Sequence, residues 1–187
     1  MASNSFTTFI HKKVLVKGEA GSGKTLFMQN LLREAVESLP RGSITLIDLA
    51  PERKIVGEKK IGGPIGLGEL EGKMNYMRPA KLHAPRLEGK TREKVVQLAR
   101  ENAEKIDAML DRFLDAPTNV LFVNDLTMYL HSGSLKKMLK VVDRANTFIG
   151  NAYEGILLAE DKGSGISETE LRLLKKLEGS MDIVITL

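Results

Sequence analysis

The chain has 187 residues, of which 42% are hydrophobic and 28% charged, with a formal net charge of +4. This length and composition predict one soluble globular domain, and no stretch comes near the roughly 18 apolar residues of a membrane-spanning helix. The absence of cysteine excludes disulfides, thiolate metal sites and cysteine nucleophiles. At the start of the chain the apolar residues precede the basic ones, the wrong order for a signal peptide, so we expect a cytoplasmic protein.

Strands and helices are predicted to alternate along the chain. Short apolar runs predict strands at residues 14–16, 44–49, 120–123, 155–159 and 182–187. Apolar residues at helical spacing predict helices over residues 23–39, 91–115 and 134–149, and a last helix that begins near Ser167. This alternation predicts an α/β fold with a mostly parallel five-stranded sheet and helices on both faces.

Two of the predicted helices carry clear start signals. Thr91 is placed to cap the long helix over 91–115. Ser167 followed by Glu170 matches a capping box, with Ile166 and Leu171 placed as its hydrophobic staple. We therefore expect Glu170 to fold back onto the first turn of its own helix.

One domain is predicted over residues 1–187, with an insertion at 50–90 between the second and third strands. Residues 57–72 read GEKKIGGPIGLGELEG and contain six glycines. So many open backbone conformations disfavour a regular element, so we expect a mobile surface loop. A role in gating access to a substrate is the alternative interpretation.

The segment GEAGSGKT at residues 18–25 fits the phosphate-binding pattern G-x-x-x-x-G-K-[ST] at every position. Glycines let successive backbone N–H groups turn towards a phosphate, and the helix that follows adds the positive end of its dipole. The Lys24 ammonium reaches the β- and γ-phosphates, and the Thr25 hydroxyl binds Mg²⁺. The predicted nucleotide contacts are Gly18, Glu19, Ala20, Gly21, Ser22, Gly23, Lys24, Thr25 and Leu26.

A second acidic residue is expected at the end of a neighbouring strand. The apolar run at 120–123 is followed by Asn124 and Asp125, and Asp125 is placed to hold Mg²⁺ through a water. Asn124 can orient Asp125 or a water molecule. We therefore predict that Thr25 and Asp125 form the metal site, and that Lys24 and Asp125 take part in catalysis.

Hydrolysis also needs a group that positions water against the γ-phosphate. Many ATPases carry a glutamate directly after the strand aspartate, but here that residue is Leu126. The candidates follow the second strand, and Glu52 is preferred to Asp48 because it lies beyond the carboxyl end of the strand, where ligands bind in open α/β sheets.

With these segments the chain resembles the RecA/KaiC-like ATPases of the P-loop NTPase superfamily. VLVKGEAGSGKTLFMQNLL is similar to their first strand, phosphate loop and helix, including the aromatic Phe27, and LFVNDLTMYL is similar to their third strand. The resemblance implies an ATPase core with sheet order 5-1-4-3-2, and often a ring or filament of subunits. It also implies a cation supplied in trans, for which Lys162 and Arg144 are candidates.

Three other interpretations of the sequence are a kinase, a GTPase and a nucleotide-binding regulator. A small-molecule or nucleotide kinase could use the same loop, with basic residues of the segment 78–94 gripping an acceptor phosphate. That segment has six basic and two acidic residues and could equally contact a nucleic-acid backbone. A GTPase is disfavoured because no N-K-x-D motif is present, and a nucleotide-binding regulator without hydrolysis stays open. The cofactors expected are ATP and Mg²⁺, and a homo-oligomer is possible.

Overall fold

A computed structural model describes residues 5–56 and 59–187. Its strands are β1 (Lys13–Gly18), β2 (Ile44–Asp48), β3 (Lys54–Val56), β4 (Lys59–Ile61), β5 (Asn75–Met77), β6 (Val120–Asn124), β7 (Thr147–Tyr153) and β8 (Ile183–Thr186). Its helices are η1 (Phe6–Phe9), α1 (Lys24–Ser38), η2 (Gly68–Leu70), α2 (Pro85–Glu88), α3 (Arg92–Asp115), α4 (Thr127–Leu130), α5 (Leu135–Arg144) and α6 (Ile166–Glu178).

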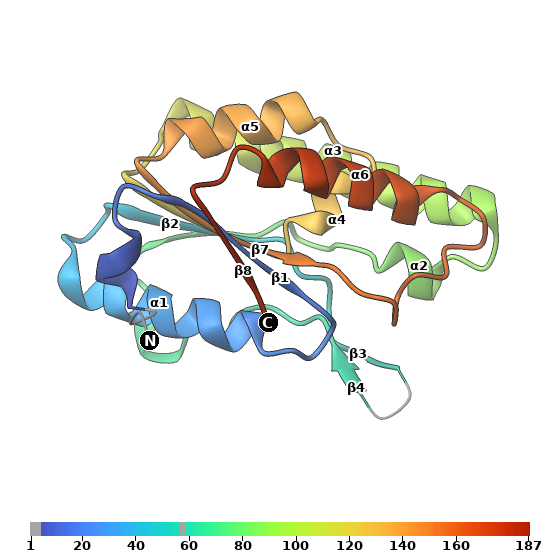
Figure 1. The fold of residues 1–187 in the computed structure, drawn as a ribbon, viewed down its shortest axis with the longest axis horizontal. Coiled ribbons are helices and arrows are strands. Elements are labelled where there is room, and N and C mark those ends of the chain that lie inside the picture. The colour runs from blue at the N-terminus through green and yellow to red at the C-terminus, as the bar shows by residue number, and fades with distance from the viewer. Residues whose placement is uncertain (1–4, 57–58) are drawn as a thin grey trace.

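Six of the strands form one sheet in the order β5-β2-β6-β7-β1-β8, and every neighbouring pair is parallel. The four central strands have almost entirely buried side chains, because helices cover the sheet on both faces. β3 and β4 form a separate antiparallel hairpin that projects beside the carboxyl end of β1 (Figure 1). The prediction of a single α/β domain with a mostly parallel sheet is confirmed.

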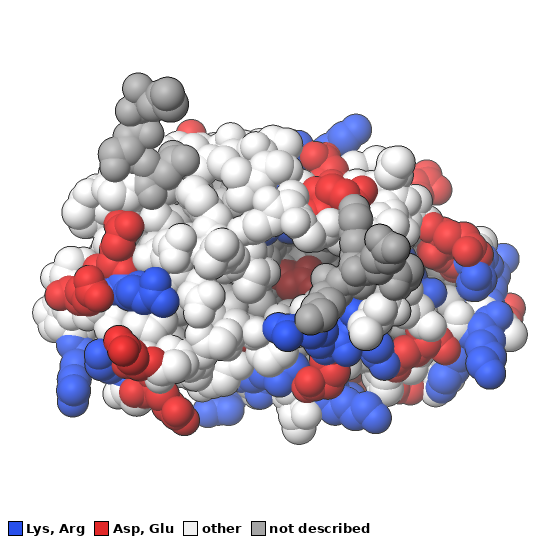
Figure 2. Space-filling view, turned by 90° about the horizontal axis from the view of Figure 1, so that it is seen from below, with Lys and Arg blue, Asp and Glu red and all other residues white. Residues whose placement is uncertain are grey.

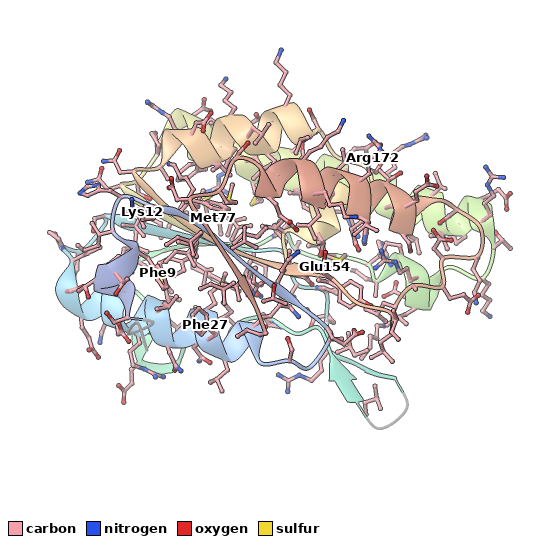
Figure 3. All side chains as sticks on the ribbon, viewed as in Figure 1. Phe9, Lys12, Phe27, Met77, Glu154 and Arg172 are labelled. Carbon is pink, nitrogen blue, oxygen red and sulfur yellow. The ribbon has the colours of Figure 1, made fainter. Side chains whose placement is uncertain are left out.

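The helices divide into two layers. α3, α4, α5 and α6 cover one face, and α1 covers the other together with η1 (Figure 1). Each layer has its own apolar core: Phe113 and Phe148 lie in the first, and Phe9 and Phe122 in the second. Figure 3 shows Phe9 and Phe27 together on the α1 side of the sheet.

The predicted sheet is wrong in its number of strands, and its order differs by the one strand that was not predicted, whereas the other five strands keep their predicted relative order. A sixth strand, β5, extends the sheet beyond β2, and its short, largely exposed sequence gave no strand signal. The fourth strand was expected at residues 155–159, but it is β7, Thr147–Tyr153. The helix expected over residues 134–149 ends as α5 at Arg144, because the chain must turn at Ala145 to enter the sheet.

The capping box predicted at the start of the last helix is also wrong. α6 begins at Ile166 after Gly165, so Ser167 lies inside its first turn. The Ser167 hydroxyl donates to the carbonyl oxygen of Ala159, and Glu170 is buried away from its own helix start. Leu171 is exposed, so it forms no staple with Ile166.

The glycine-rich segment is more ordered than predicted. It contains β4 and η2, and Ile65 and Leu70 pack in the core on the α1 side. Residues 57 and 58, where part of the expected loop falls, lie outside the described residues. The cap predicted at Thr91 is confirmed, because its side chain accepts from the backbone of Lys94 at the start of α3. Within the described residues, no helix is both long and apolar enough to cross a membrane.

Candidate functional site

The phosphate-loop motif lies where its chemistry requires, between the carboxyl end of β1 and the amino end of α1. Gly21 and Gly23 adopt φ angles of 81° and 96°, a region that side chains disfavour. At Gly18 an added Cβ would overlap the carbonyl oxygen of Leu187 on the neighbouring edge strand. The loop therefore needs glycine at these positions for its own conformation.

Lys24 holds the loop closed from inside. Its ammonium donates to the carbonyl oxygens of Gly18, at 2.9 Å, and Glu19, at 2.6 Å. Burial lowers its pKa, and the charges of Asp125 and Glu19 act in the opposite direction. The hydroxyl of Ser22 is buried with no hydrogen-bond partner among the described residues. A buried, unpaired hydroxyl in a glycine-rich loop is a donor that a phosphate oxygen can satisfy.

Asp125 follows β6 in a left-handed conformation with φ 57°. Its backbone N–H donates to Asn151 Oδ1 at 2.6 Å, and the Thr127 hydroxyl donates to its carboxylate at 3.1 Å. Burial raises the pKa of Asp125 to about 6, and the negative charge of Glu170 adds to that rise. Asp125 is thus a carboxylate held in a poorly solvated place near another carboxylate.

The raised pKa of Asp125 predicts how stability depends on pH in Mg²⁺-free buffer. Its ordinary value is 3.8, so the folded protein binds this proton more tightly than the unfolded chain does. The Asp125 carboxyl group alone should therefore lower stability by about 1–3 kcal/mol as pH rises from 4 to 7, and Asp125→Asn should lack this contribution. Chemical denaturation of both proteins at several pH values measures this, and parallel curves would contradict it.

A buried polar ladder joins the carboxyl ends of three strands beneath the site. Asn124 Nδ2 donates to Asp48 Oδ1 at 2.7 Å, and Asn151 Nδ2 donates to Asn124 Oδ1 at 2.8 Å. Asn151 in turn accepts from the backbone of Asp125, so the ladder runs from β2 through β6 and β7 to the predicted metal-site residue. The ladder fixes where Asp125 lies relative to the sheet.

Asp48 anchors the far end of this ladder and is completely buried. Its carboxylate accepts from Asn124, from the backbone of Ala50 and Ile65, and from the Tyr76 hydroxyl at 3.2 Å. All these bonds are internal to the fold, so Asp48 is committed to structure and is not free to position water.

We predict that Asp48→Ala lowers the free energy of unfolding by about 2–3 kcal/mol, because it leaves several buried donors unpaired. Denaturant titration measures the change. Asp115→Ala, on the exposed end of α3, is the matched control. A loss no larger than that of the control would show that water or another group replaces the carboxylate.

Glu52, the preferred candidate for positioning water, lines the same cavity as Lys24 and Asp125. Its side chain is 65% exposed, and it pairs with Arg78 at 2.9 Å. The structure therefore brings Glu52 to the rim of the site, where solvent surrounds its carboxylate.

Glu19 ties the phosphate loop to the segment after β7. Its carboxylate accepts from the backbone N–H groups of Ile156, at 2.8 Å, and Leu157, at 3.2 Å. The close approach requires Gly155, where a Cβ would collide with the carboxylate. Tyr153 also bonds to Glu19, and burial raises the pKa of Tyr153 to about 12. These contacts hold the phosphate loop against the segment after β7.

Lys24, Glu52, Asn124, Asp125 and Asn151 border one cavity of about 490 Å³. Its walls are the phosphate loop, the hairpin β3–β4, α2, the residues after β6 and the start of α6. Figure 2 shows a hollow on this face beside the hairpin, with acidic atoms inside it and basic side chains at its rim. The predicted residues Lys24, Thr25, Glu52 and Asp125 all lie on its lining.

Sequence reasoning missed several charged or polar residues of this cavity and misjudged one. Glu170, His131 and Tyr153 line it without having been proposed for the site, and Arg86 was proposed only as part of a basic segment. A signal for Glu170 was present. Helical spacing places it on the same face of α6 as Ile166, Leu174 and Leu177, which are all buried. A charged residue on the apolar face of a helix needs a partner, and this one has two.

The basic segment 78–94 does not act as one surface. Arg78 pairs with Glu52, and Arg86 is buried in an ion pair with Glu170 at 2.9 Å. Lys81, Lys90, Arg92 and Lys94 are exposed. Of the two trans-acting candidates, Lys162 pairs with Glu160, and Arg144 lies at the end of α5, before the amino end of β7 and thus at the opposite edge of the sheet from the phosphate loop.

The site fits Mg²⁺ bound together with a phosphate ligand. The ion uses one or two protein oxygens and completes its shell with waters and phosphates. Thr25 and Asp125 supply oxygens of the right kind in one cavity, and no cluster of three acidic or histidine ligands exists among the described residues. The donor set thus suits a metal that arrives with a nucleotide.

The phosphate loop after the first strand and the parallel sheet covered on both faces are consistent with a P-loop NTPase fold. No protein-family model matches the sequence, and no curated protein matches it. Among solved structures, the chain is similar to the Pif1 helicase from Candida albicans, with 12% identity and a TM-score of 0.41. The alignment covers 97% of this chain and 37% of the helicase chain. This likeness adds nothing to the argument on function, which depends on the site.

Proposed function

We propose that this protein binds ATP with Mg²⁺ and hydrolyses it. The observation that carries the proposal is the phosphate loop in a cavity that it shares with Asp125 and Thr25. The loop amides, Lys24 and Ser22 bind the phosphates. Thr25 would hold Mg²⁺ directly and Asp125 would hold it through a water, and the ion would supply positive charge for the phosphates.

Within the P-loop NTPases we propose kinship with the RecA/KaiC-like ATPases. The segments of the phosphate loop and of β6 support it, and so does the aromatic Phe27 on α1, which packs partly against the core. Proteins of this kind often assemble into a ring or filament of subunits. Gel filtration with and without ATP tests whether this protein does so.

Transfer of the γ-phosphate to a small acceptor is the second candidate. The cavity extends from the phosphate loop to the buried Arg86 on α2, so there is room for a group beside the terminal phosphate. The exposed residues Lys81, Lys90, Arg92 and Lys94 could instead meet a nucleic-acid backbone, and such binding weakens steeply with salt.

The deciding experiment follows the label of γ-³²P-ATP with the pure protein. Label released as inorganic phosphate in an Mg²⁺-dependent reaction supports the ATPase. Label on an added nucleotide or sugar phosphate, with little free phosphate, supports the kinase. Stimulation by DNA that disappears at high salt supports a nucleic-acid partner. Retention of all label on ATP, together with no binding in calorimetry, would remove the proposal.

A further inference from the structure

Glu170 is a buried charge in the wall of the nucleotide cavity. Only 5% of the residue is exposed, although it lies on a surface helix. Arg86 Nη2 donates to Glu170 Oε1 at 2.9 Å, and His131 Nε2 donates to Glu170 Oε2 at 2.6 Å. Glu170 therefore joins α6, α2 and the end of α4 at one point.

The cluster of Glu170, Arg86 and His131 faces the predicted chemistry. All three residues line the cavity together with Lys24 and Asp125. The guanidinium of Arg86 also lies 5.7 Å from the centre of the Tyr153 ring, and Tyr153 bonds to Glu19 of the phosphate loop. The cluster is thus linked to both halves of the site.

The two acidic residues at and beyond the end of β2 are poorly placed to position the attacking water. Asp48 uses its carboxylate for internal hydrogen bonds, and Glu52 is at the exposed rim, paired with Arg78. By contrast, Glu170 is shielded from solvent and has a fixed orientation. An ionised carboxylate offers about four acceptor positions, and only two hydrogen bonds to Glu170 are present among the described residues.

We propose that Glu170 is the residue that positions the attacking water and takes its proton, and that Arg86 and His131 hold Glu170 for that task. The inference rests on the proposed ATP hydrolysis. The water oxygen forms a bond to the γ-phosphorus as the bond from that phosphorus to the β–γ bridging oxygen breaks. The bridging electron pair leaves with ADP. One proton of the water passes to Glu170 and from there to solvent, so that ADP and inorganic phosphate are the products.

Arg86 has a second part in this arrangement. Its Nε donates to the Ser167 hydroxyl at 3.1 Å, and Nη2 is used by Glu170. Nη1 has no hydrogen bond to any described residue, so it can donate to a γ-phosphate oxygen in the cavity. An arginine supplied by the same chain would stabilise the charge that develops on the transferred group. Arg86 would then take the part that was expected of a cation supplied in trans.

The first test is Glu170→Gln, which keeps the size and polarity of the side chain but removes its ability to take a proton. We expect single-turnover hydrolysis to fall about 100-fold or more, the range for loss of a general base. The ATP dissociation constant, measured by calorimetry, should stay within a few-fold. Glu168→Gln, an exposed neighbour on the same helix, is the matched control and should behave as wild type.

A purely structural ion pair gives a different pattern. It would lower the melting temperature of Glu170→Gln while the folded fraction hydrolysed ATP at the normal rate. If the single variant does not fold, Arg86→Gln with Glu170→Gln removes both charges together and leaves no lone buried charge. This double variant should fold, bind ATP and fail to hydrolyse it.

The outcomes separate this inference from the proposed function. Normal turnover in Glu170→Gln, or in the folded double variant, would overturn the inference. So would a loss of turnover in Glu52→Gln with none in Glu170→Gln, which would assign the water to Glu52. Wild-type protein that binds ATP without hydrolysing it would overturn the inference and leave nucleotide binding standing. Wild-type protein that binds no ATP would remove both.

Discussion

Lys24→Ala is expected to weaken ATP binding by about 100- to 1000-fold while leaving the fold intact. The Lys24 ammonium is the buried cation of the phosphate loop, and its present partners are two carbonyl oxygens of the loop itself. A phosphate offers stronger, charge-assisted acceptors at about 1.5–3 kcal/mol per bond, and each 1.4 kcal/mol is about a tenfold change in affinity. Removing the cation should therefore remove most of the phosphate affinity.

Calorimetry with ATP and Mg²⁺ measures the affinity, and circular dichroism checks the fold. Lys140→Ala, an exposed lysine on α5 outside the cavity, is the matched control. Lys24→Arg adds a stricter comparison, because it keeps the charge but changes the length and shape of the donor group. Unchanged affinity in Lys24→Ala would remove the central claim about this site.

The second large effect is expected for Asp125→Asn, on turnover. We predict that Mg²⁺-dependent hydrolysis falls about 100-fold or more, since the variant loses the negative charge that holds the metal beside the phosphates. ATP binding should change much less, because the loop amides and Lys24 remain. The amide keeps the size of the side chain, so the backbone bond to Asn151 need not shift.

Turnover should be measured over a range of Mg²⁺ concentrations. A weakened metal site predicts that activity is partly recovered at high Mg²⁺, whereas a misfolded site predicts no recovery. Asp115→Asn, exposed at the end of α3, is the control. Equal turnover of the variant and wild type at saturating Mg²⁺ would place the metal-site acid elsewhere.

Sequence signals succeeded where the physics is local. The cap at Thr91 depends on a hydrogen bond from the backbone of Lys94, three positions ahead, so a short stretch of sequence contains both partners. The sequence failed for β7, where Gly150 and Asn151 weaken the strand pattern. In the folded protein Gly150 is required, because a Cβ there would collide with Leu126 and Phe148. Asn151 is required by its bonds to Asn124 and Asp125. Apart from Phe148 in β7 itself, these partners lie in β6 or directly after it.

The start of α6 was also mispredicted from local sequence. Ser167 and Glu170 have the spacing of a capping box, but the fold provides stronger partners for both. Arg86, more than eighty positions earlier in the chain, donates to Ser167 and pairs with Glu170. A charged hydrogen bond in a buried place outweighs a local cap worth about 1 kcal/mol. Glu170 consequently faces the cavity.

The phosphate loop could be predicted from the sequence alone. The eight residues of the loop are contiguous, and glycines within the segment set its backbone geometry. The class of fold could also be predicted, since apolar strands alternate with amphipathic helices along the sequence. Which side chains surround the loop depends on the tertiary structure and could not be predicted from the sequence. Arg86, His131, Asn151 and Glu170 come from four separate elements or their ends, and they line one cavity because a parallel sheet gathers the carboxyl ends of its strands at one edge. The spacing of these residues in the sequence cannot predict their contacts, because the contacts depend on how the helices pack over that edge of the sheet.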